Sequence, residues 1–214
     1  MMIRLLVTLL AVAMPPAHAA PVMLPTDIEV LRTLPPVAEE KPVVSPATGE
    51  WVDPPGLPRA IAEPRLVVHK SRRQIELWSG DEVVRTYRIA LGLEPVAPKQ
   101  RQGDYATPEG TYYVCSKNPQ SKYALALGLS YPGPDDAERG LAAGLISATE
   151  RDAIVAAWNA RTRPPWNTKL GGEIMIHGHG SSWDWTAGCI ALNGQDIEEL
   201  YRVVPVGTSV EILP

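Results

Sequence analysis

The stretch that decides the fold reads Ile174-Met175-Ile176-His177-Gly178 and resumes, after a short loop, as Thr186-Ala187-Gly188-Cys189-Ile190-Ala191-Leu192. The apolar residues from Glu173 to Ile176 indicate a short buried strand that leads into His177. Cys189 lies 12 positions after this histidine, beyond a loop that contains glycine. Two rigid elements can therefore present a thiol and an imidazole to each other.

Cysteine and histidine in this arrangement indicate nucleophilic catalysis. A thiol is a strong nucleophile only as the thiolate, and a nearby histidine promotes its ionisation. We therefore predict Cys189 as the nucleophile and His177 as the base. Gly188 lets a substrate approach the backbone closely, and the N–H groups around it can receive a developing oxyanion. Taken alone, the two residues also fit a buried structural cysteine and a core histidine.

The order and spacing of these residues resemble the L,D-transpeptidase (YkuD-like) catalytic domain, in which a strand ends in His-Gly and a Ser/Thr-x-Gly-Cys block follows. Thr107-Pro108-Glu109-Gly110 is similar to the Thr-Pro-x-Gly loop of that family. Val206-Gly207-Thr208-Ser209-Val210 is similar to its closing strand, and Asp196 stands where an acidic residue usually opens its last helix. The resemblance covers roughly residues 65–213 and is far more specific than one Cys–His pair.

The resemblance implies a β-rich mixed fold with a Cys–His site in a cleft, and a peptidoglycan stem peptide ending in D-alanine as the substrate. Cys189 would form a thioester with release of D-Ala, and His177 would move the protons. Transfer to an amine gives a cross-link, whereas transfer to water gives hydrolysis. The sequence does not choose between these outcomes or the attachment and cleavage of wall lipoproteins. No metal or organic cofactor is expected.

Further site residues are expected around this pair. Oxyanion or substrate-binding roles are expected for Gly188, Gly178, Thr186 and Trp185. The chain departs from the family at Ala187, where histidine is frequent, and at Ala191, where arginine or asparagine is frequent. The loop before Cys189 is also shorter than in most members. Its aromatic and acidic residues either take over substrate binding or pack the loop down; they are Trp183, Asp184 and Trp185.

Two other classes of function are compatible with parts of the sequence. His177 and His179 form a His-x-His pair, which in a strand would place both on one face, as in some zinc peptidases. A zinc site needs about three protein ligands, and the other candidate, His69, is followed by no aspartate. A non-catalytic wall-binding module is the third class, and the presence of both Cys189 and His177 speaks against it.

The whole chain has 214 residues and a net charge of −4, which argues against a nucleic-acid partner. Its only tight basic cluster, Lys70, Arg72 and Arg73, is interpreted as a solvated turn. Of the two cysteines, Cys115 ends a strand-like run, whereas Cys189 follows a glycine. Their unequal surroundings favour separate roles over a disulfide.

The N-terminal region predicts export. Residues 1–19 combine Arg4, a ten-residue apolar run and an Ala-x-Ala site, which indicates a signal peptide and no stable membrane insertion after cleavage. Residues 20–64 are rich in proline and are expected to form an extended linker, interrupted by a short helix at Asp27–Thr33. The catalytic domain is then 65–214, located in the periplasm or cell wall.

Within this domain, the periodicity predicts many short strands and two isolated helices, which favours a mainly β or α+β fold over alternating βαβ units. Asn193 is expected to cap the last helix. The predicted strands are Leu66–His69, Arg73–Trp78, Glu82–Leu91, Thr111–Cys115, Glu173–Ile176 and Thr208–Leu213, and the predicted helices are Ser147–Arg161 and Asp196–Val203.

Overall fold

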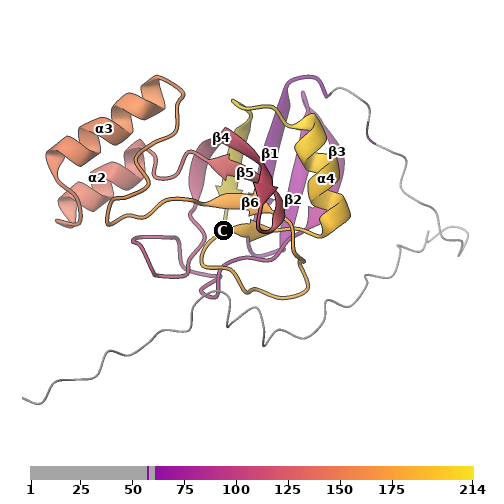
Figure 1. Ribbon diagram of the computed structural model, residues 1–214, viewed down its shortest axis with the longest axis horizontal. Helices are drawn as coiled ribbons and strands as arrows, with labels where there is room; N and C mark the ends of the chain where they lie inside the picture. Colours follow the sequence, from indigo (N-terminus) through magenta and orange to yellow (C-terminus); the bar gives the residue numbers. More distant parts are fainter. Residues whose placement is uncertain (1–56, 58–60) are drawn as a thin grey trace, which may run out of the picture. The chain divides into compact units, whose positions relative to one another are not determined.

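The computed structural model describes residue 57 and residues 61–214 (Figure 1). The expected signal peptide, the helix at Asp27–Thr33 and most of the linker lie outside the described residues. Nothing among the described helices is both long enough and apolar enough to cross a membrane.

A single curled sheet of mixed strand direction forms the domain, as the fold class predicted. Its eight strands follow the order β3-β2-β1-β8-β4-β5-β6-β7. The pairs β1–β8 and β6–β7 are parallel, and all other neighbours are antiparallel. The strands are β1 (Pro64–His69), β2 (Gln74–Ser79), β3 (Glu82–Arg88), β4 (Gly110–Ser121), β5 (Ala124–Leu129), β6 (Met175–His177), β7 (Ile190–Ala191) and β8 (Ser209–Leu213).

Three short helices complete the domain: α2 (Pro134–Ala142), α3 (Ala148–Asn159) and α4 (Gly194–Val203). The predicted capping box opens α3, because Ser147 Oγ accepts the Glu150 N–H at 3.3 Å and Glu150 Oε2 accepts the Ser147 N–H at 2.8 Å. Asn193 is the N-cap residue of α4, as predicted, but its side chain makes no capping hydrogen bond. Its Oδ1 accepts hydrogen bonds from Ser181 instead.

The helices pack in two different ways. Helices α2 and α3 lie side by side, on the far side of the molecule from β1 to β3 (Figure 1). They share a small apolar cluster that includes Ala137 and Ile154. Helix α4 packs against β5 and buries Ile197 and Leu200 in the main core.

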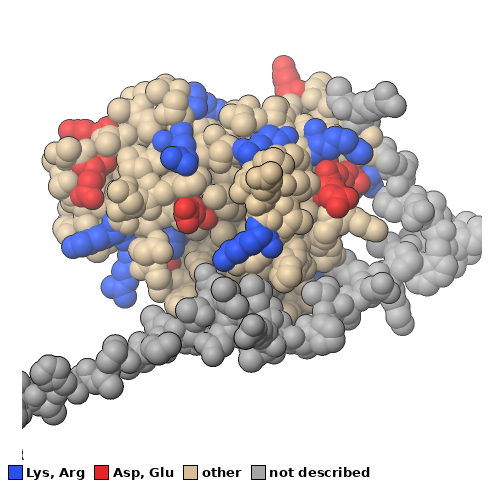
Figure 2. All heavy atoms as spheres, viewed as in Figure 1, with Lys and Arg blue, Asp and Glu red and all other residues tan. Residues whose placement is uncertain are grey.

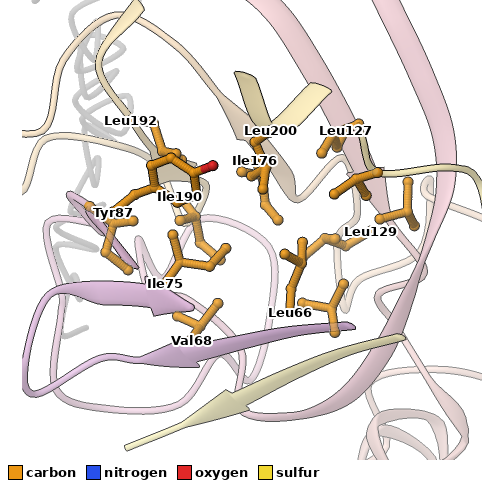
Figure 3. Close-up of a cluster of buried hydrophobic side chains, with 14 of the residues drawn as sticks. Leu66, Val68, Ile75, Tyr87, Leu127, Leu129, Ile176, Ile190, Leu192 and Leu200 are labelled. Atoms are coloured by element: carbon orange, nitrogen blue, oxygen red, sulfur yellow. The ribbon is translucent and has the colours of Figure 1, made fainter. Parts of the chain in front are cut away.

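The main core holds the residues next to the two predicted catalytic groups. Ile176 precedes His177, Ile190 follows Cys189, and both isoleucines are fully buried. Figure 3 shows them in one cluster with Ile75 and Val68. Burying an isoleucine side chain contributes about 1.5–3 kcal/mol. The strand ends that carry the site are therefore anchored by the core itself.

The boundary of the folded unit lies earlier than the sequence suggested. Leu57, within the expected linker, is only 8% exposed and belongs to the main core, and Ile61 packs against it. Pro64, the last residue of the expected linker, begins β1. The peptide carbonyl of Ala62 accepts the Gly80 N–H at 3.1 Å. The end of the proline-rich segment is thus part of the domain.

Candidate active site

Strands β6 and β7 bring His177 and Cys189 to the same face of the sheet. The parallel register pairs Ile176 with Ile190 and His177 with Ala191. If this register is continued by one residue toward the start of both strands, Cys189 lies opposite Met175. Side chains at paired positions share a face, and so do residues two apart along a strand. His177 and Cys189 therefore lie diagonally on one face, while the two isoleucines point to the core.

His177, the predicted base, is a buried neutral imidazole with one defined tautomer. Its Nδ1 lies 2.6 Å from the Gly178 carbonyl oxygen, which can only accept, so Nδ1 carries the proton and Nε2 holds a lone pair. The side chain is 2% exposed. Burial lowers its pKa to about 4, and the nearby positive charge of Lys122 acts in the same direction. Gly178, predicted as a site residue, therefore orients the imidazole.

Two aromatic rings fix the plane of the imidazole. The Tyr123 ring stacks on His177 at a centroid distance of 4.5 Å and an interplanar angle of 20°. Trp185 meets the imidazole edge at 5.6 Å, and its Nε1–H donates to the Gly180 carbonyl at 3.1 Å. Trp185 thus lies beside His177. Its role in substrate binding stays a prediction. Tyr123 was missed, because a single tyrosine in a turn gives no periodic signal.

Cys189 rests as a neutral thiol. Its side chain is partly buried, and Sγ–H donates to the Glu173 carbonyl oxygen at 3.5 Å. Burial raises the pKa of the thiol to about 11, against the opposing influence of the Met175 N–H and of Lys99 and Lys122. The thiol of Cys189 and the imidazole of His177 are thus both neutral at pH 7, which favours general-base catalysis over a preformed ion pair for the predicted nucleophile and base.

Thr186 and Gly188 shape the turn that precedes the nucleophile. Thr186 is buried, and its Oγ1 donates to the Cys189 carbonyl at 2.7 Å and accepts the Gly188 N–H at 3.1 Å. Gly188 has a φ of 128°, and a Cβ there would lie 2.6 Å from the Ala106 carbonyl oxygen. Only glycine fits this approach. The Gly188 N–H, expected as an oxyanion donor, is engaged by Thr186 in this structure.

A buried lysine holds the segment Thr107–Gly110 next to this turn. The basic cluster lies in a turn with Arg72 exposed, as predicted, but the prediction that it is solvated is wrong for Lys70. Lys70 is 1% exposed, and its Nζ lies 2.6 Å from Glu109 Oε1. It also donates to the carbonyls of Val96, Ala97 and Thr107. Thr107 Oγ1 in turn accepts the Gly92 N–H at 3.2 Å. These bonds satisfy a charge that would be costly to bury alone.

The residues of the shortened loop before Cys189 lie in two different settings. Asp184 forms a salt bridge with Arg73, at 2.7 Å between Oδ2 and Nη2, and so packs the loop down. Trp183 is 42% exposed and remains at the surface. The packing alternative thus applies to Asp184, whereas substrate binding by the exposed Trp183 stays a prediction.

Neither Cys115 nor His179 belongs to a set of metal ligands among the described residues. Strand β6 ends at His177, and His179 lies beyond it with a φ of 91°, so the pair does not share a strand face. Within the described part of the chain, histidine, cysteine, aspartate and glutamate side chains form no group of three that could hold a metal ion. Cys115 is a partly buried free thiol whose pKa is raised by burial.

Comparison with known proteins gives a consistent picture. A family model described as "YkuD: L,D-transpeptidase catalytic domain" matches residues 63–212. The Escherichia coli (strain K12) protein named "Putative L,D-transpeptidase YafK" is 27% identical over 145 residues, which cover 65% of this chain and 46% of the relative. The chain thus matches about half the length of this curated relative.

Solved structures of similar fold were also found. The helical cell shape determining protein Pgp2 (K307A mutant) of Campylobacter jejuni has 23% identity and a TM-score of 0.49, over 71% of this chain and 47% of that chain. The L,D-transpeptidase from Mycobacterium smegmatis has 15% identity and a TM-score of 0.43, over 72% and 59%.

Proposed function

Because the chain belongs to the L,D-transpeptidase catalytic domain family, we propose that it is a peptidoglycan L,D-transpeptidase acting through a thioester on Cys189. The observation that supports this most strongly is the pairing of β6 with β7, which brings a neutral imidazole and a thiol to one face of the sheet. The donor is a stem peptide ending in D-alanine.

The first half-reaction forms the thioester. Cys189 Sγ attacks the carbonyl carbon of the bond between an L-configured centre and D-Ala. The thiol proton passes to Nε2 of His177, which is available because Nδ1–H is held by the Gly178 carbonyl. The C–N bond then breaks, and the proton leaves on the amine of D-Ala.

The second half-reaction transfers the acyl group away from Cys189 and regenerates the free thiol. An acceptor amine attacks the thioester carbonyl and gives up a proton to His177, and that proton returns to the departing sulfur. An amine of a second stem gives a cross-link, whereas water gives a free carboxylate. Neither half-reaction requires a metal or an organic cofactor.

The remaining site residues receive positioning and binding roles. Thr186 and Gly188 hold the turn that presents Cys189, and Gly178 orients the base. Trp185 fixes the imidazole plane and forms part of the binding surface. Developing negative charge on the scissile carbonyl would be met by backbone N–H groups of this turn.

The place of action is outside the cytoplasm. The signal-peptide pattern of residues 1–19 supports export to the periplasm or cell wall. Figure 2 shows Lys and Arg in separate small groups, interspersed with Asp and Glu, on the face drawn. Together with the net charge of −4, this distribution gives no support for a nucleic-acid partner.

The experiment is incubation of the purified full chain with muropeptides that carry a D-Ala-terminated stem, followed by mass analysis of products and of the intact protein. Wild type and Cys115→Ala should release D-Ala and carry a transient acyl group. Cys189→Ala and His177→Gln should release none. Retention of activity by Cys189→Ala would overturn the proposal, and products lacking cross-links would assign the thioester to hydrolysis.

A control separates the thiol mechanism from zinc catalysis. A chelator should leave turnover unchanged, and His179→Ala should reduce it far less than His177→Gln. Loss of activity on chelation, with recovery on adding zinc alone, would favour a metallopeptidase.

A further inference from the structure

His179 has a backbone conformation that the surrounding fold imposes on it. Its φ of 91° lies in a region that glycine occupies readily and that other residues rarely adopt. Hydrogen bonds fix the chain on both sides of it. The Gly178 N–H donates to the Tyr123 carbonyl at 3.1 Å, and the Gly180 N–H donates to the Leu192 carbonyl at 2.9 Å. The strain at His179 persists because its neighbours determine the path of the backbone.

The stability of the fold does not explain a histidine at this position. Glycine would avoid the strain, and the chain has glycine at residues 178 and 180 but not at 179. The histidine side chain is exposed, so it buries little apolar surface of its own that could offset the strain. A strained residue beside reacting groups is therefore a candidate for a role in the site.

The His179 ring packs on the two aromatic rings that contact the predicted base. Its centroid lies 5.9 Å from that of Tyr123 and 5.8 Å from that of Trp185, with interplanar angles of 55° and 63°. Tyr123 and Trp185 also contact each other, at 5.6 Å and 67°. Both contact the His177 imidazole, at 4.5 Å and 5.6 Å. The four rings thus form one cluster of stacked and edge-to-face contacts.

Exposure to solvent differs sharply across this cluster. His177 is 2% exposed and Trp185 is 9% exposed, whereas His179 is exposed. Tyr123 is half-buried. His179 is therefore the member of the cluster that faces solvent most, and it contacts the two rings that pack against the base.

We propose that His179 is a positioning residue, whose ring holds Tyr123 and Trp185 against His177 and keeps water away from the base. This inference deepens the proposed function, because it concerns the base of the same site. A base that is screened from water stays neutral and keeps Nε2 available for the thiol proton. The role requires an aromatic ring at residue 179, not a group that carries a proton.

The titratable groups around His177 come from three segments. Lys122 and Tyr123 lie on the turn between β4 and β5, His179 follows β6, and Cys189 precedes β7. Burial is the main cause that lowers the pKa of His177, and the charges of His179 and Lys122 act in the same direction. The test must therefore separate the screening by the His179 ring from the effect of its charge.

The test follows the protonation of the His177 imidazole by NMR in the full chain, with its resonances assigned from His177→Gln. Two variants, His179→Gly and His179→Asn, remove the ring and suit a positive φ. His179→Phe is the matched control, because it keeps an aromatic ring without a charge. In wild type and His179→Phe, His177 should stay neutral down to about pH 4. In both ringless variants it should take up its proton about 1 pH unit higher or more, since water then solvates the imidazolium.

Urea unfolding and the kinetics distinguish this role from a contribution to stability. His179→Gly should keep or raise the urea midpoint of wild type, because glycine relieves the strained φ. Even so, its acid limb of kcat/KM should move upward together with the titration of His177. A residue that only stabilised the fold would change the urea midpoint and leave the titration where it was.

Two outcomes would overturn the proposal. One is an unchanged titration of His177 in both ringless variants. The other is a shift in His179→Phe as large as that in His179→Gly, since the charge and not the ring would then be responsible. The NMR titration needs no substrate, so its result is independent of the thioester mechanism, which depends on Cys189→Ala failing to release D-Ala.

Discussion

The carboxylate of Asp184 accepts hydrogen bonds from two nitrogens of the Arg73 guanidinium, at 3.1 Å between Nε and Oδ1 and 2.7 Å between Nη2 and Oδ2. Asp184 Oδ1 also accepts the Leu91 N–H at 2.8 Å. The Leu91 carbonyl in turn accepts the N–H groups of Trp185 and Thr186. The turn between β1 and β2 therefore holds the loop that leads into Cys189.

Removing the Asp184 carboxylate should loosen the turn that leads into Cys189. We expect Asp184→Ala to lower kcat/KM by about 10- to 100-fold, because small displacements of a reacting group are costly. The free energy of unfolding should fall by about 1–2 kcal/mol, since the ion pair is partly exposed and the Leu91 N–H loses its acceptor. Arg73→Lys should behave as a weaker version of the same change, because lysine lacks the planar fork.

Asp152→Ala is the matched control for this prediction. Asp152 pairs with Arg151 on the exposed surface of α3. Its removal should leave both the kinetics and the urea midpoint unchanged. Equal kinetics for Asp184→Ala and Asp152→Ala would show that the loop keeps its geometry without Arg73.

The same ion pair shows where sequence reasoning reached its limit. Arg73 and Lys70 stand among polar neighbours, and local pattern therefore indicated a solvated turn. Their partners come from residues 26 to 111 positions further along the chain. Burial of a charge by such distant carbonyls and carboxylates depends on the tertiary fold, which no local window contains.

Local signals succeeded where a structure is decided locally. The alternation of Ile75 and Leu77 with polar residues predicted β2, and the Ser147–Glu150 pair predicted the start of α3. Strand β5 was missed, because its sequence ALALGL has no β-branched residues and no polar residue to alternate with the leucines. Helix α2 was missed behind Pro132, Gly133 and Pro134, although proline at its first position suits a helix start. The family motif predicted Cys189 and His177, which the structure brings to one face of the sheet, but not the packing of Tyr123.

Lowering the pH should destabilise the folded protein through His177. Its pKa falls from 6.5 to about 4 on folding, so between these values the unfolded chain binds a proton that the folded protein excludes. Stability should therefore decrease as the pH is lowered from 6.5 to 4, by on the order of 3 kcal/mol in total from this group. The acid limb of kcat/KM should lie near pH 4, since the neutral base persists to that point.

Urea unfolding of wild type and His177→Gln at several pH values isolates this contribution. Carboxylates titrate in both proteins, so the difference between the two stability curves should narrow as the pH falls from 6.5 to 4. Parallel curves, or an acid limb of kcat/KM near pH 6.5, would show that the imidazole is solvated in the working enzyme.

Two truncations test the boundary of the folded domain. A chain that begins at residue 57 keeps Leu57 in the core, whereas one that begins at Pro64 loses both Leu57 and Ile61. We expect the first to match the thermal stability of the full chain and the second to fall below it. Leu57→Ala in the full chain should cost about 1–3 kcal/mol. Equal thermal midpoints for the two truncated chains would show that Leu57 does not stabilise the core.

The last prediction concerns the close contact between Gly92 and the backbone beside the nucleophile turn. A Cβ at residue 92 would lie 1.9 Å from the Tyr105 carbonyl oxygen and 3.2 Å from Gly188 Cα. Both neighbours are backbone atoms, so no rotamer change can relieve the clash. Gly92→Ala should therefore destabilise the protein by about 1–3 kcal/mol and push the Tyr105 segment or the nucleophile turn away.

A glycine in open space separates this steric effect from the general effect of replacing glycine. No atom lies within 4 Å of a Cβ at Gly194, which begins α4. Gly194→Ala should be neutral or stabilising by up to about 1 kcal/mol, because alanine restricts the unfolded chain. If Gly92→Ala retains both its urea midpoint and its rate of Cys189 alkylation, the Tyr105 backbone can move without disturbing the turn. A lower midpoint with a changed alkylation rate, set against an unaffected Gly194→Ala, would place the contact between Gly92, Tyr105 and Gly188 among the features that position the nucleophile.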